Sequence, residues 1–365
     1  MAIAGLEKFK WTYRGTPFYV AGAPGYRKNF SRDALIAGIL ARDPDLLQSQ
    51  LAFSASRQGT KQSRHTGEVP GIIHHEFPAA TLNGLSTRYN ASDATALYLI
   101  GHEVYQKLTK NFRFAASQQD HITCAAEYIL KHLRDYLFTE DPRYSGAQKF
   151  ALKVTYWKDS ALVGRKSGTP HYPVVYPLVH AINLRGLRSA ARLLKRGDLK
   201  ETAQKMAARL VELFDEKLGV FSIAKDAGGL VHGVSSDSLH MLFYLSPHDL
   251  PPRIPTRIES ASKMLETPIG YRTLDPALAS KMTDTYHANT VWPFEQAVIM
   301  NGARKFGLLH AEEVAKRIFS HMQESDRECF YIEADGTIRT GGNVSQLWTR
   351  AAKIYFESGN FAPLL

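Results

Sequence analysis

The sequence predicts an all-α fold in which helical hairpins are arranged as a toroid around one pocket. Apolar residues recur at helical spacing over most of the 365 residues, and convincing strands are few. Long loops rich in Trp, Tyr, His, Asp and Glu separate the helices, a composition that does not favour disorder. A simple helical bundle needs no such loops. We therefore expect the loops to gather at one end of the toroid and to form the pocket.

Helical periodicity predicts about eleven helices, and an Asp or Ser often stands where its side chain could accept from the free amides of a helix start. The expected helices cover residues 32–41, 45–57, 91–109, 117–137, 174–195, 198–216, 235–245, 253–266, 288–306, 309–323 and 344–357. Short hairpins are expected at 219–224 and at 329–342, the second with a turn at Asp335-Gly336. No linker or short repeat divides the chain, so residues 1–365 are expected to form a single domain.

Composition excludes several classes of function. The formal net charge is +10, but the densest basic run, residues 187–200, is typical of an amphipathic helix with a solvated basic face and accompanies no nucleic-acid docking motif. Cys124 and Cys329 provide neither metal-ligand spacing nor a disulfide framework. No apolar run suits a signal peptide or approaches the ~20 residues of a membrane span. We expect a soluble, cytoplasmic protein that binds neither nucleic acid nor membranes.

The stretch TYWKDSALVG, residues 155–164, has neither a helical stripe nor useful strand alternation. Tyr156 and Trp157 beside Asp159 are typical of a sugar subsite, because aromatic faces pack against the apolar side of a pyranose. An apolar surround would also raise the pKa of the Asp159 carboxyl, as a general acid requires near neutral pH. The alternatives are a helix cap or an ion pair with Lys158.

Four more loop-to-helix stretches combine aromatic and polar groups. Each has a plainer structural reading, such as a capped helix or a buried histidine. His74, His75 and Glu76 have the wrong spacing for metal ligands on one helical face, so no metal is expected. The candidate residues in these stretches are Arg32 and Asp33; Tyr89, Asn90 and Asp93; His287 and Trp292; and Glu333, Gln346 and Trp348.

Glycoside hydrolysis generally uses two carboxyl groups on opposite sides of one sugar ring. Asp159 and Glu333 lie in loops that follow different helical hairpins. A ring of hairpins would be able to bring these two side chains across one pocket.

The order of motifs resembles the six-hairpin (α/α)6 glucosidases typified by the amylo-α-1,6-glucosidase domain of glycogen debranching enzyme. Glycosylglycerate hydrolases and processing α-glucosidase I are more distant relatives of that family. The resemblance spans nearly the whole chain. Its motifs are AGAPGYRKNFSRDAL, GEVPGIIHHE with TRYNASDA, YWKDS with YPVVYPLVHAINL, PIGYRTLDP, YHANTVWP and GGNVSQLWTRAA.

The resemblance implies an inverting, exo-acting α-glucosidase without metal or organic cofactor. It implies that Asp159 is the general acid and that Glu333, upstream of SQLW, is the general base, with the carboxyl groups roughly 6.5–9.5 Å apart. The implied glucose subsite contains Arg32, Asp33, Tyr89, Asn90, Asp93, Trp157, His287 and Trp292. To these we add, as candidate sugar contacts, Tyr156, Lys158, Gln346 and Trp348.

The sequence departs from the family in ways that bear on the substrate. SSDSLHML, residues 235–242, stands where relatives often carry an Asn-Gln pair, so Asp237 and His240 are expected to alter sugar contacts. We expect the protein to lack the large additional domains of many relatives. Binding of a long polymer therefore has less support than cleavage of a small glycoside, and the basic charge keeps an anionic leaving group such as glycerate in consideration. The sequence does not specify an oligomeric state.

Two other functions remain open. Helical toroids also include sugar epimerases and polysaccharide lyases, for which the candidate residues would be His74, His75, His171 and His287. A non-catalytic sugar sensor or scaffold would bind saccharide without turnover.

Overall fold

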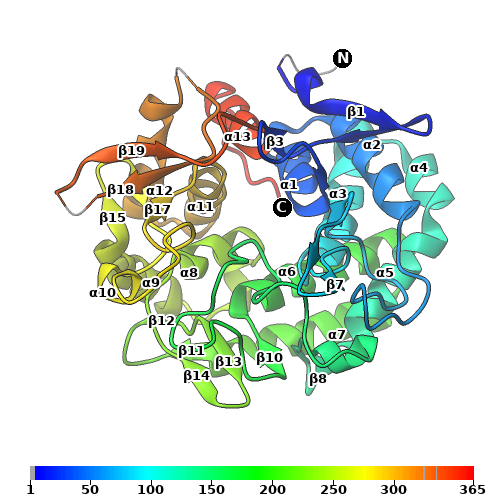
Figure 1. Ribbon diagram of the computed structural model, residues 1–365, viewed down its shortest axis with the longest axis horizontal. Helices are drawn as coiled ribbons and strands as arrows, with labels where there is room; N and C mark the ends of the chain where they lie inside the picture. The colour runs from blue at the N-terminus through cyan, green and yellow to red at the C-terminus, as the bar shows by residue number, and fades with distance from the viewer. Residues whose placement is uncertain (1–4, 324, 334) are drawn as a thin grey trace.

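The computed structural model describes residues 5–323, 325–333 and 335–365 and has the predicted all-helical toroid architecture (Figure 1). Six helices pack side by side in a closed inner ring, each contacting the next and the last contacting the first. In ring order they are α1 (Ser31–Ala41), α3 (Ala94–Thr109), α6 (Pro177–Leu194), α8 (Asp237–His240, continued by the 3₁₀ turn Met241–Phe243), α11 (Pro293–Phe306) and α13 (Leu347–Glu357).

An outer layer of helices covers this ring. Its longer members are α2 (Pro44–Ala55), α5 (Gln119–Lys131), α7 (Gly197–Ala208), α9 (Arg253–Ser262) and α12 (Leu309–Lys316), and each contacts the inner helix next to it. Short α4 (Phe112–Ser117) and α10 (Pro276–Ala279) lie in connections. Every residue of α1 is buried, as expected for a helix enclosed by both layers.

Small residues allow the inner helices to pack closely. A Cβ on Gly186 of α6 would come within 2.9 Å of the Cα of Ala96 on α3. A Cβ on Gly302 of α11 would come within 2.7 Å of the backbone nitrogen of Phe243. Side chains at these positions would force the helices apart, so the ring depends on glycine where neighbouring backbones approach.

Five inner helices begin two to five residues later than their periodicity predicts, and proline is the reason for two of them, α6 and α11. Pro177 and Pro293 occupy the first turns of α6 and α11, and the residue before a proline disfavours helical geometry. The preceding residues form the short strands β10 (Val174–Val175) and β17 (Thr290–Val291) instead. The loops before these helices are therefore extended and turn into the centre of the toroid.

Small antiparallel sheets of two or three strands lie in the connections between the helices. The predicted hairpin at 329–342 is confirmed as β18 (Cys329–Ile332) and β19 (Ile338–Gly341), with Cys329 opposite Gly341. The predicted hairpin near 219–224 is two hairpins, β11–β12 (Phe214–Asp215, Val220–Phe221) and β13–β14 (Ala224–Asp226, Gly229–Val231). Pattern reading missed β1–β2 (Lys10–Tyr13, Thr16–Tyr19), which packs on α2.

The remaining short strands pair in the connections between helices. They are β3 (Gly22–Ala23), β4 (Asn29–Phe30), β5 (Glu76–Phe77), β6 (Thr81–Leu82), β7 (Leu85–Ser86), β8 (Leu133–Arg134), β9 (Leu137–Phe138), β15 (Glu266–Thr267), β16 (Gly270–Tyr271) and β20 (Ser345–Gln346). The β8–β9 hairpin explains why the expected helix at 117–137 ends at Lys131.

The two ends of the chain close the ring at a seam between α1 and α13, blue and red in Figure 1. Strand β20 pairs with β3, so that Gln346 lies opposite Gly22. The backbone amide of Leu347 donates to Ala21 O at 2.7 Å, and the amide of Gly25 donates to Asn343 Oδ1 at 2.8 Å. Segments from opposite ends of the sequence are thus hydrogen-bonded where the central cavity opens.

Candidate functional site

A cavity of about 400 Å³, open to solvent, lies among the loops that precede the inner helices. Its wall combines six aromatic side chains and a histidine with three carboxyl groups, one guanidinium and one amide. The lining residues are Tyr26, Phe30, Arg32, Asp33, Trp157, Asp159, Tyr286, His287, Trp292, Glu328, Gln346 and Trp348. Such a mixture of apolar faces and a few convergent polar groups is typical of a small-molecule site.

Several of these residues stand where an inner helix starts. Phe30, Trp292 and Gln346 are the N-cap residues of α1, α11 and α13. The amide ends of these helices therefore lie close to the cavity wall. They carry partial positive charge, which favours acidic groups and oxygen-rich ligands near them.

The aromatic wall is built around Trp292. The His287 ring stacks on it at 5.2 Å between centroids, while Trp157 and Trp348 meet it edge-on at 5.7 and 5.8 Å. The hydroxyl of Ser160 and Nδ1 of His287 are 2.8 Å apart, which ties the loop of Asp159 to the loop of His287. These contacts fix the aromatic faces before any ligand arrives.

Asp159 has the environment of a carboxyl that holds a proton near neutral pH. Its side chain is 30 % exposed, and it lines the cavity. Burial raises its pKa to about 7, even though Arg32 lowers it, and Asp93 adds a further increase. Arg32 Nη1 is 4.0 Å from Asp159 Oδ2, whereas Arg32 Nε donates to Asp93 at 2.7 Å. The guanidinium is thus directed mainly at Asp93, and the pKa of Asp159 stays raised despite the nearby positive charge.

Glu328 is the second carboxyl of the cavity, and it is 2 % exposed. Its Oε1 accepts a hydrogen bond from the Tyr286 hydroxyl at 2.7 Å, and its Oε2 accepts from the backbone amide of Asn343 at 2.6 Å. Burial raises the pKa of Glu328, while these two hydrogen bonds oppose the increase. They also fix the orientation of the carboxylate.

Asp33 is the third carboxyl. It accepts a hydrogen bond from Gln346 Nε2 at 3.3 Å. Burial raises its pKa well above the ordinary value, Arg32 opposes this, and the charges of Glu328 and Asp159 add to it. Three acids around one small cavity cannot all ionise at low cost, because like charges in a poorly solvated space repel.

The structure does not place Glu333 in the cavity. This residue follows β18, its side chain is 45 % exposed, and its Oε1 accepts a hydrogen bond from Arg339 Nε at 2.9 Å across the hairpin. The predicted hairpin carries Glu333 out to its solvent-exposed end, whereas Glu328 stands at its base beside the cavity. The convergence with Asp159 that the sequence predicted for Glu333 is therefore found at Glu328.

Five other predicted sugar contacts are not among the residues that line this cavity. Tyr89 donates through its hydroxyl to Arg57 O at 2.9 Å, and Asn90 accepts from the backbone amide of Ala151 at 2.9 Å. Asp93 pairs with Arg32 behind the wall. Tyr156 and Lys158 point the other way, toward Asp237. These side chains hold the loops rather than face the cavity.

The remaining predicted residues come together in the cavity: Arg32, Asp33, Trp157, Asp159, His287, Trp292, Gln346 and Trp348. Sequence reasoning did not select Tyr26, Phe30 or Glu328 as site residues, and Tyr286 entered it only as the first residue of the YHANTVWP motif. The glycine pair Gly341-Gly342 was the one sequence feature that could have pointed to Glu328, because glycine often stands where another group approaches the backbone closely. Gly342 has φ +65°, and a Cβ there would collide with Glu328 Oε2.

The four histidines of the epimerase or lyase alternative do not converge. His74 contacts Ser31 and Asn29 in the interior, His75 is buried beside Thr87, and His171 is exposed. Only His287 of these four lines the cavity, and burial lowers its pKa well below the ordinary value. Within the described residues no group of three or more metal-ligating side chains is found, and no helix there is long and apolar enough to cross a bilayer.

Solved structures share this fold. The GH63 mannosylglycerate hydrolase from Thermus thermophilus in complex with Tris and D-glycerate superposes with a TM-score of 0.71 at 12 % identity, covering 96 % of this chain and 98 % of that one. The same hydrolase in complex with glucose gives 0.70 at 15 % identity, covering 97 % and 98 %. An uncharacterized conserved protein from that organism gives 0.68 at 13 % identity, covering 93 % and 95 %.

Neither a family model nor a curated protein matches the sequence. At identities this low the superpositions establish the fold alone. The chain therefore shares the helical toroid of the GH63 mannosylglycerate hydrolase, over nearly the full length of both chains.

Proposed function

We propose that this protein is an inverting, exo-acting glycoside hydrolase for which an α-glucoside is the substrate. Asp159 acts as the general acid and Glu328 as the general base, in place of the Glu333 that the sequence suggested. The observation that carries the proposal is the convergence of these two carboxyl groups in one aromatic-lined cavity. The fold shared with a glycoside hydrolase solved in complex with glucose supports it.

The different environments of the two acids suit different roles. Asp159, with a pKa of about 7, can give a proton to the glycosidic oxygen near neutral pH. Glu328 accepts two hydrogen bonds that favour its charged form, so it is suited to take a proton from water. Two carboxyls with different protonation states are what glycoside hydrolysis with inversion requires.

The size of the cavity supports exo-action. The cavity encloses about 400 Å³ of empty space, including space that is open to solvent, which leaves room for a small ligand such as a single sugar residue. Trp157, Trp292 and Trp348 offer faces for the apolar side of a pyranose. Asp33, Gln346 and Arg32 provide acceptors and donors for its hydroxyl groups.

The reaction class is tested by incubating the purified protein with a panel of α- and β-glucosides and α-mannosides. We expect cleavage of an α-glucoside with β-glucose as the first product, because water attacks from the face opposite the leaving group. Anomer-resolved proton NMR measures this directly. Release of α-glucose would exclude inversion, and turnover of none of the glycosides would exclude hydrolysis.

A groove beside the cavity suggests where the leaving group extends. It encloses about 1020 Å³, open to solvent, between residues 161–168 and 278–284. The first segment directly follows Asp159 and Ser160, and the second leads into Tyr286 and His287. Both segments of the groove thus adjoin, along the chain, residues that line the cavity, and one of these is the proposed general acid Asp159.

The groove has a cationic lining. Lys153, Lys166 and Lys281 are exposed there, and none forms an ion pair with another residue that the structure describes. Arg165 also lines the groove but pairs with Asp226 at 2.6 Å. Asp284 is the acidic member of the lining. We therefore propose that substrates with a carboxylate on the leaving group are preferred over neutral ones; D-glycerate, found in the GH63 mannosylglycerate hydrolase complex, is one such acid.

Replacing Lys166 and Lys281 by Ala is expected to raise KM for a glucoside with a carboxylate leaving group by about 2- to 10-fold, as exposed charge pairs are weak. KM for a neutral alkyl glucoside should change less than twofold. Steady-state kinetics at low and high salt measure both, and the effect should fade in salt. The matched control is Lys200→Ala on α7. Equal changes for both substrates would contradict an electrostatic role of the groove.

A further inference from the structure

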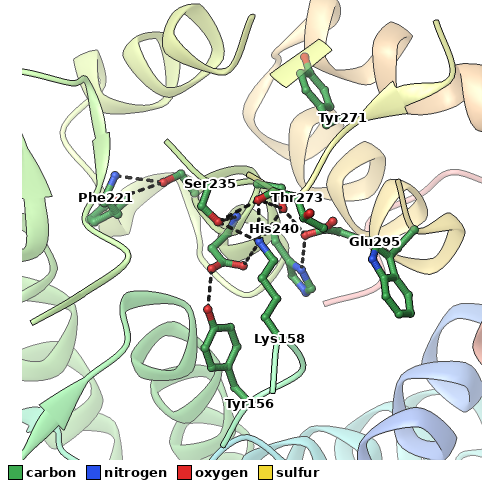
Figure 2. A network of polar contacts seen from close by, with 12 residues as sticks. Tyr156, Lys158, Phe221, Ser235, His240, Tyr271, Thr273 and Glu295 are labelled. Atoms are coloured by element: carbon green, nitrogen blue, oxygen red, sulfur yellow. Dashed lines mark hydrogen bonds and ion pairs between the residues drawn. The ribbon is translucent and has the colours of Figure 1, made fainter. Parts of the chain in front are cut away.

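Lys158 points away from the cavity although both of its sequence neighbours line it. Trp157 and Asp159 line the cavity. Lys158 is 8 % exposed, and its side chain extends toward Ser235 and Thr273 (Figure 2). Sequence reasoning expected this lysine to contact the sugar. Its place in the wall calls for another explanation.

The Lys158 ammonium is surrounded by acceptors from other loops. Nζ donates to Ser235 Oγ at 2.8 Å, to Ser236 Oγ at 2.9 Å and to Thr273 O at 3.0 Å. It also lies 2.9 Å from Asp237 Oδ1 in an ion pair. The loop of the proposed general acid is thereby fastened to the start of α8 and to the segment that follows β16.

The contacts continue around this ammonium, as Figure 2 shows. Asp237 Oδ2 accepts from the Tyr156 hydroxyl at 2.9 Å. Ser236 Oγ donates to Glu295 Oε1 at 2.7 Å, and His240 Nδ1 lies 3.3 Å from the same oxygen. The buried Lys158 network, as we call it, comprises Tyr156, Lys158, Ser235, Ser236, Asp237, His240, Thr273 and Glu295. Asp237 and His240, which the sequence led us to expect near the sugar, thus lie in the wall and not in the cavity lining.

The network also supports the Trp157 ring. His240 lies 5.8 Å and Phe294 5.2 Å from it, measured between centroids. Because Tyr156 and Lys158 are both anchored, the backbone on either side of Trp157 is fixed. A side chain held on both sides can shift little, and small displacements of reacting groups cost large factors in rate.

We propose that Lys158 is a positioning residue which, through its ion pair with Asp237, holds Trp157 and Asp159 in place for the proposed hydrolysis. The expected effect of Lys158 on the rate rests on the proposed function. The expected effect of Lys158 and Asp237 on the geometry and charge balance of the loop does not depend on whether the protein hydrolyses a glycoside.

The ion pair also balances charge next to the proposed acid. Several titratable or charged groups face Asp159 or lie around it: Arg32 and Asp33 from α1, Asp93 before α3, Glu76 from β5, Tyr26, Tyr286 and His287 from loops, and Glu328 before β18. Lys158, the residue before Asp159 in the sequence, adds one positive charge on the far side of the cavity wall, and Asp237 compensates it. Loss of Asp237 alone would leave a positive charge that favours ionised Asp159.

The test compares pH profiles of kcat/KM for Lys158→Met, Asp237→Asn and the double variant. In Asp237→Asn the uncompensated ammonium lowers the pKa of Asp159, so the alkaline limb should move down by about half a unit or more. In the double variant both charges are gone, and the limb should return to that of the wild type. In Lys158→Met and in the double variant kcat should fall about 10- to 100-fold, with a smaller change in KM.

Lys305→Met is the matched control, because Lys305 is partly buried and donates to a backbone carbonyl, Phe243 O, at 2.6 Å, but does not line the cavity. It should keep the wild-type profile. Wild-type kcat in Lys158→Met, or an alkaline limb in the double variant that stays shifted, would overturn the proposal. Near-UV circular dichroism verifies that each variant is folded.

A carboxyl ¹³C NMR titration measures the pKa of Asp159 without any substrate, so it tests the inference independently of the proposed function. If the wild-type protein hydrolyses no glycoside, the function fails, but the titration still compares the wild type with Asp237→Asn. A lower Asp159 midpoint in the variant supports the charge balance. An unchanged midpoint refutes it.

Discussion

Replacing Asp159 by Asn is expected to lower kcat for an α-glucoside by about 10²- to 10⁴-fold, the usual contribution of a general acid. Wild-type activity should fall as pH rises through about 7, where Asp159 loses its proton. As pH falls, activity should decrease when Glu328 becomes protonated. The pH at which this happens should be above the usual pKa of a glutamate, because the pKa of Glu328 is raised. The bell-shaped profile of kcat/KM measures both limbs, and the alkaline limb should vanish from the residual activity of the variant.

The same substitution should stabilise the protein at alkaline pH. Asp159 has a higher pKa folded than unfolded, so the folded state binds more protons between pH ~4 and 7 and loses stability as pH rises through this window. Asn removes that cost. The gain above pH 7 should be on the order of 1–4 kcal/mol, measured by urea unfolding at pH 5 and pH 8. An inactive variant with no gain at pH 8 would contradict the raised pKa, and an active variant would contradict the role as acid.

Glu328→Gln is expected to lower kcat by about 10²- to 10⁴-fold, because glutamine keeps the shape of the side chain but cannot accept a proton from water. The acid limb of the pH profile should disappear. Azide, which attacks without a base, should restore part of the turnover with an activated glucosyl fluoride. Steady-state kinetics with and without azide measure this.

Glu333→Gln is the matched control, since it makes the same chemical change in the same segment. Glu333 pairs with Arg339 at the exposed end of the hairpin, so kcat should stay within about twofold and stability within about 0.5 kcal/mol of the wild type. The opposite pattern, an inactive Glu333→Gln with an active Glu328→Gln, would return the role of base to Glu333.

Helical periodicity located the elements of the toroid well because both helical layers bury apolar faces. The starts of α6 and α11 were placed too early, since apolar residues continue into β10 and β17 and periodicity does not detect the change of backbone. Pro177 and Pro293 mark the true starts. The β1–β2 hairpin was missed because every residue of β1 is exposed, so no alternation of buried and exposed positions marks this strand.

The residues of the cavity were partly predictable because loop-to-helix junctions concentrate its side chains. Arg32, Trp292 and Gln346 sit at such junctions, and the motif order found them. Which of the other candidate residues line the cavity depends on the tertiary fold. Glu328 and Glu333 flank the same strand. The predicted turn at Asp335-Gly336 already implied that Glu333 stands near the tip of the hairpin, but the position of its base beside the cavity depends on the tertiary fold.

Lys158 shows another limit of reading a linear pattern. In an irregular loop neither a period of two nor one of 3.6 tells which side chains share a direction. The acceptors of Lys158 come from residues 235–237 and 273, far along the chain. The residues next to Lys158 in the sequence give no indication of these acceptors.

The seam between α1 and α13 has a consequence for synthesis of the protein. Asp159 is translated long before Glu328, and Gln346 and Trp348 emerge among the last residues, yet all four border one cavity. Until β20 pairs with β3, the cavity that holds Asp159 lacks the part of its wall formed by Gln346 and Trp348. The cavity is therefore complete only after release of the full chain, when the carboxyl-terminal helix packs against α1, so truncated chains that lack this helix should not catalyse the proposed hydrolysis.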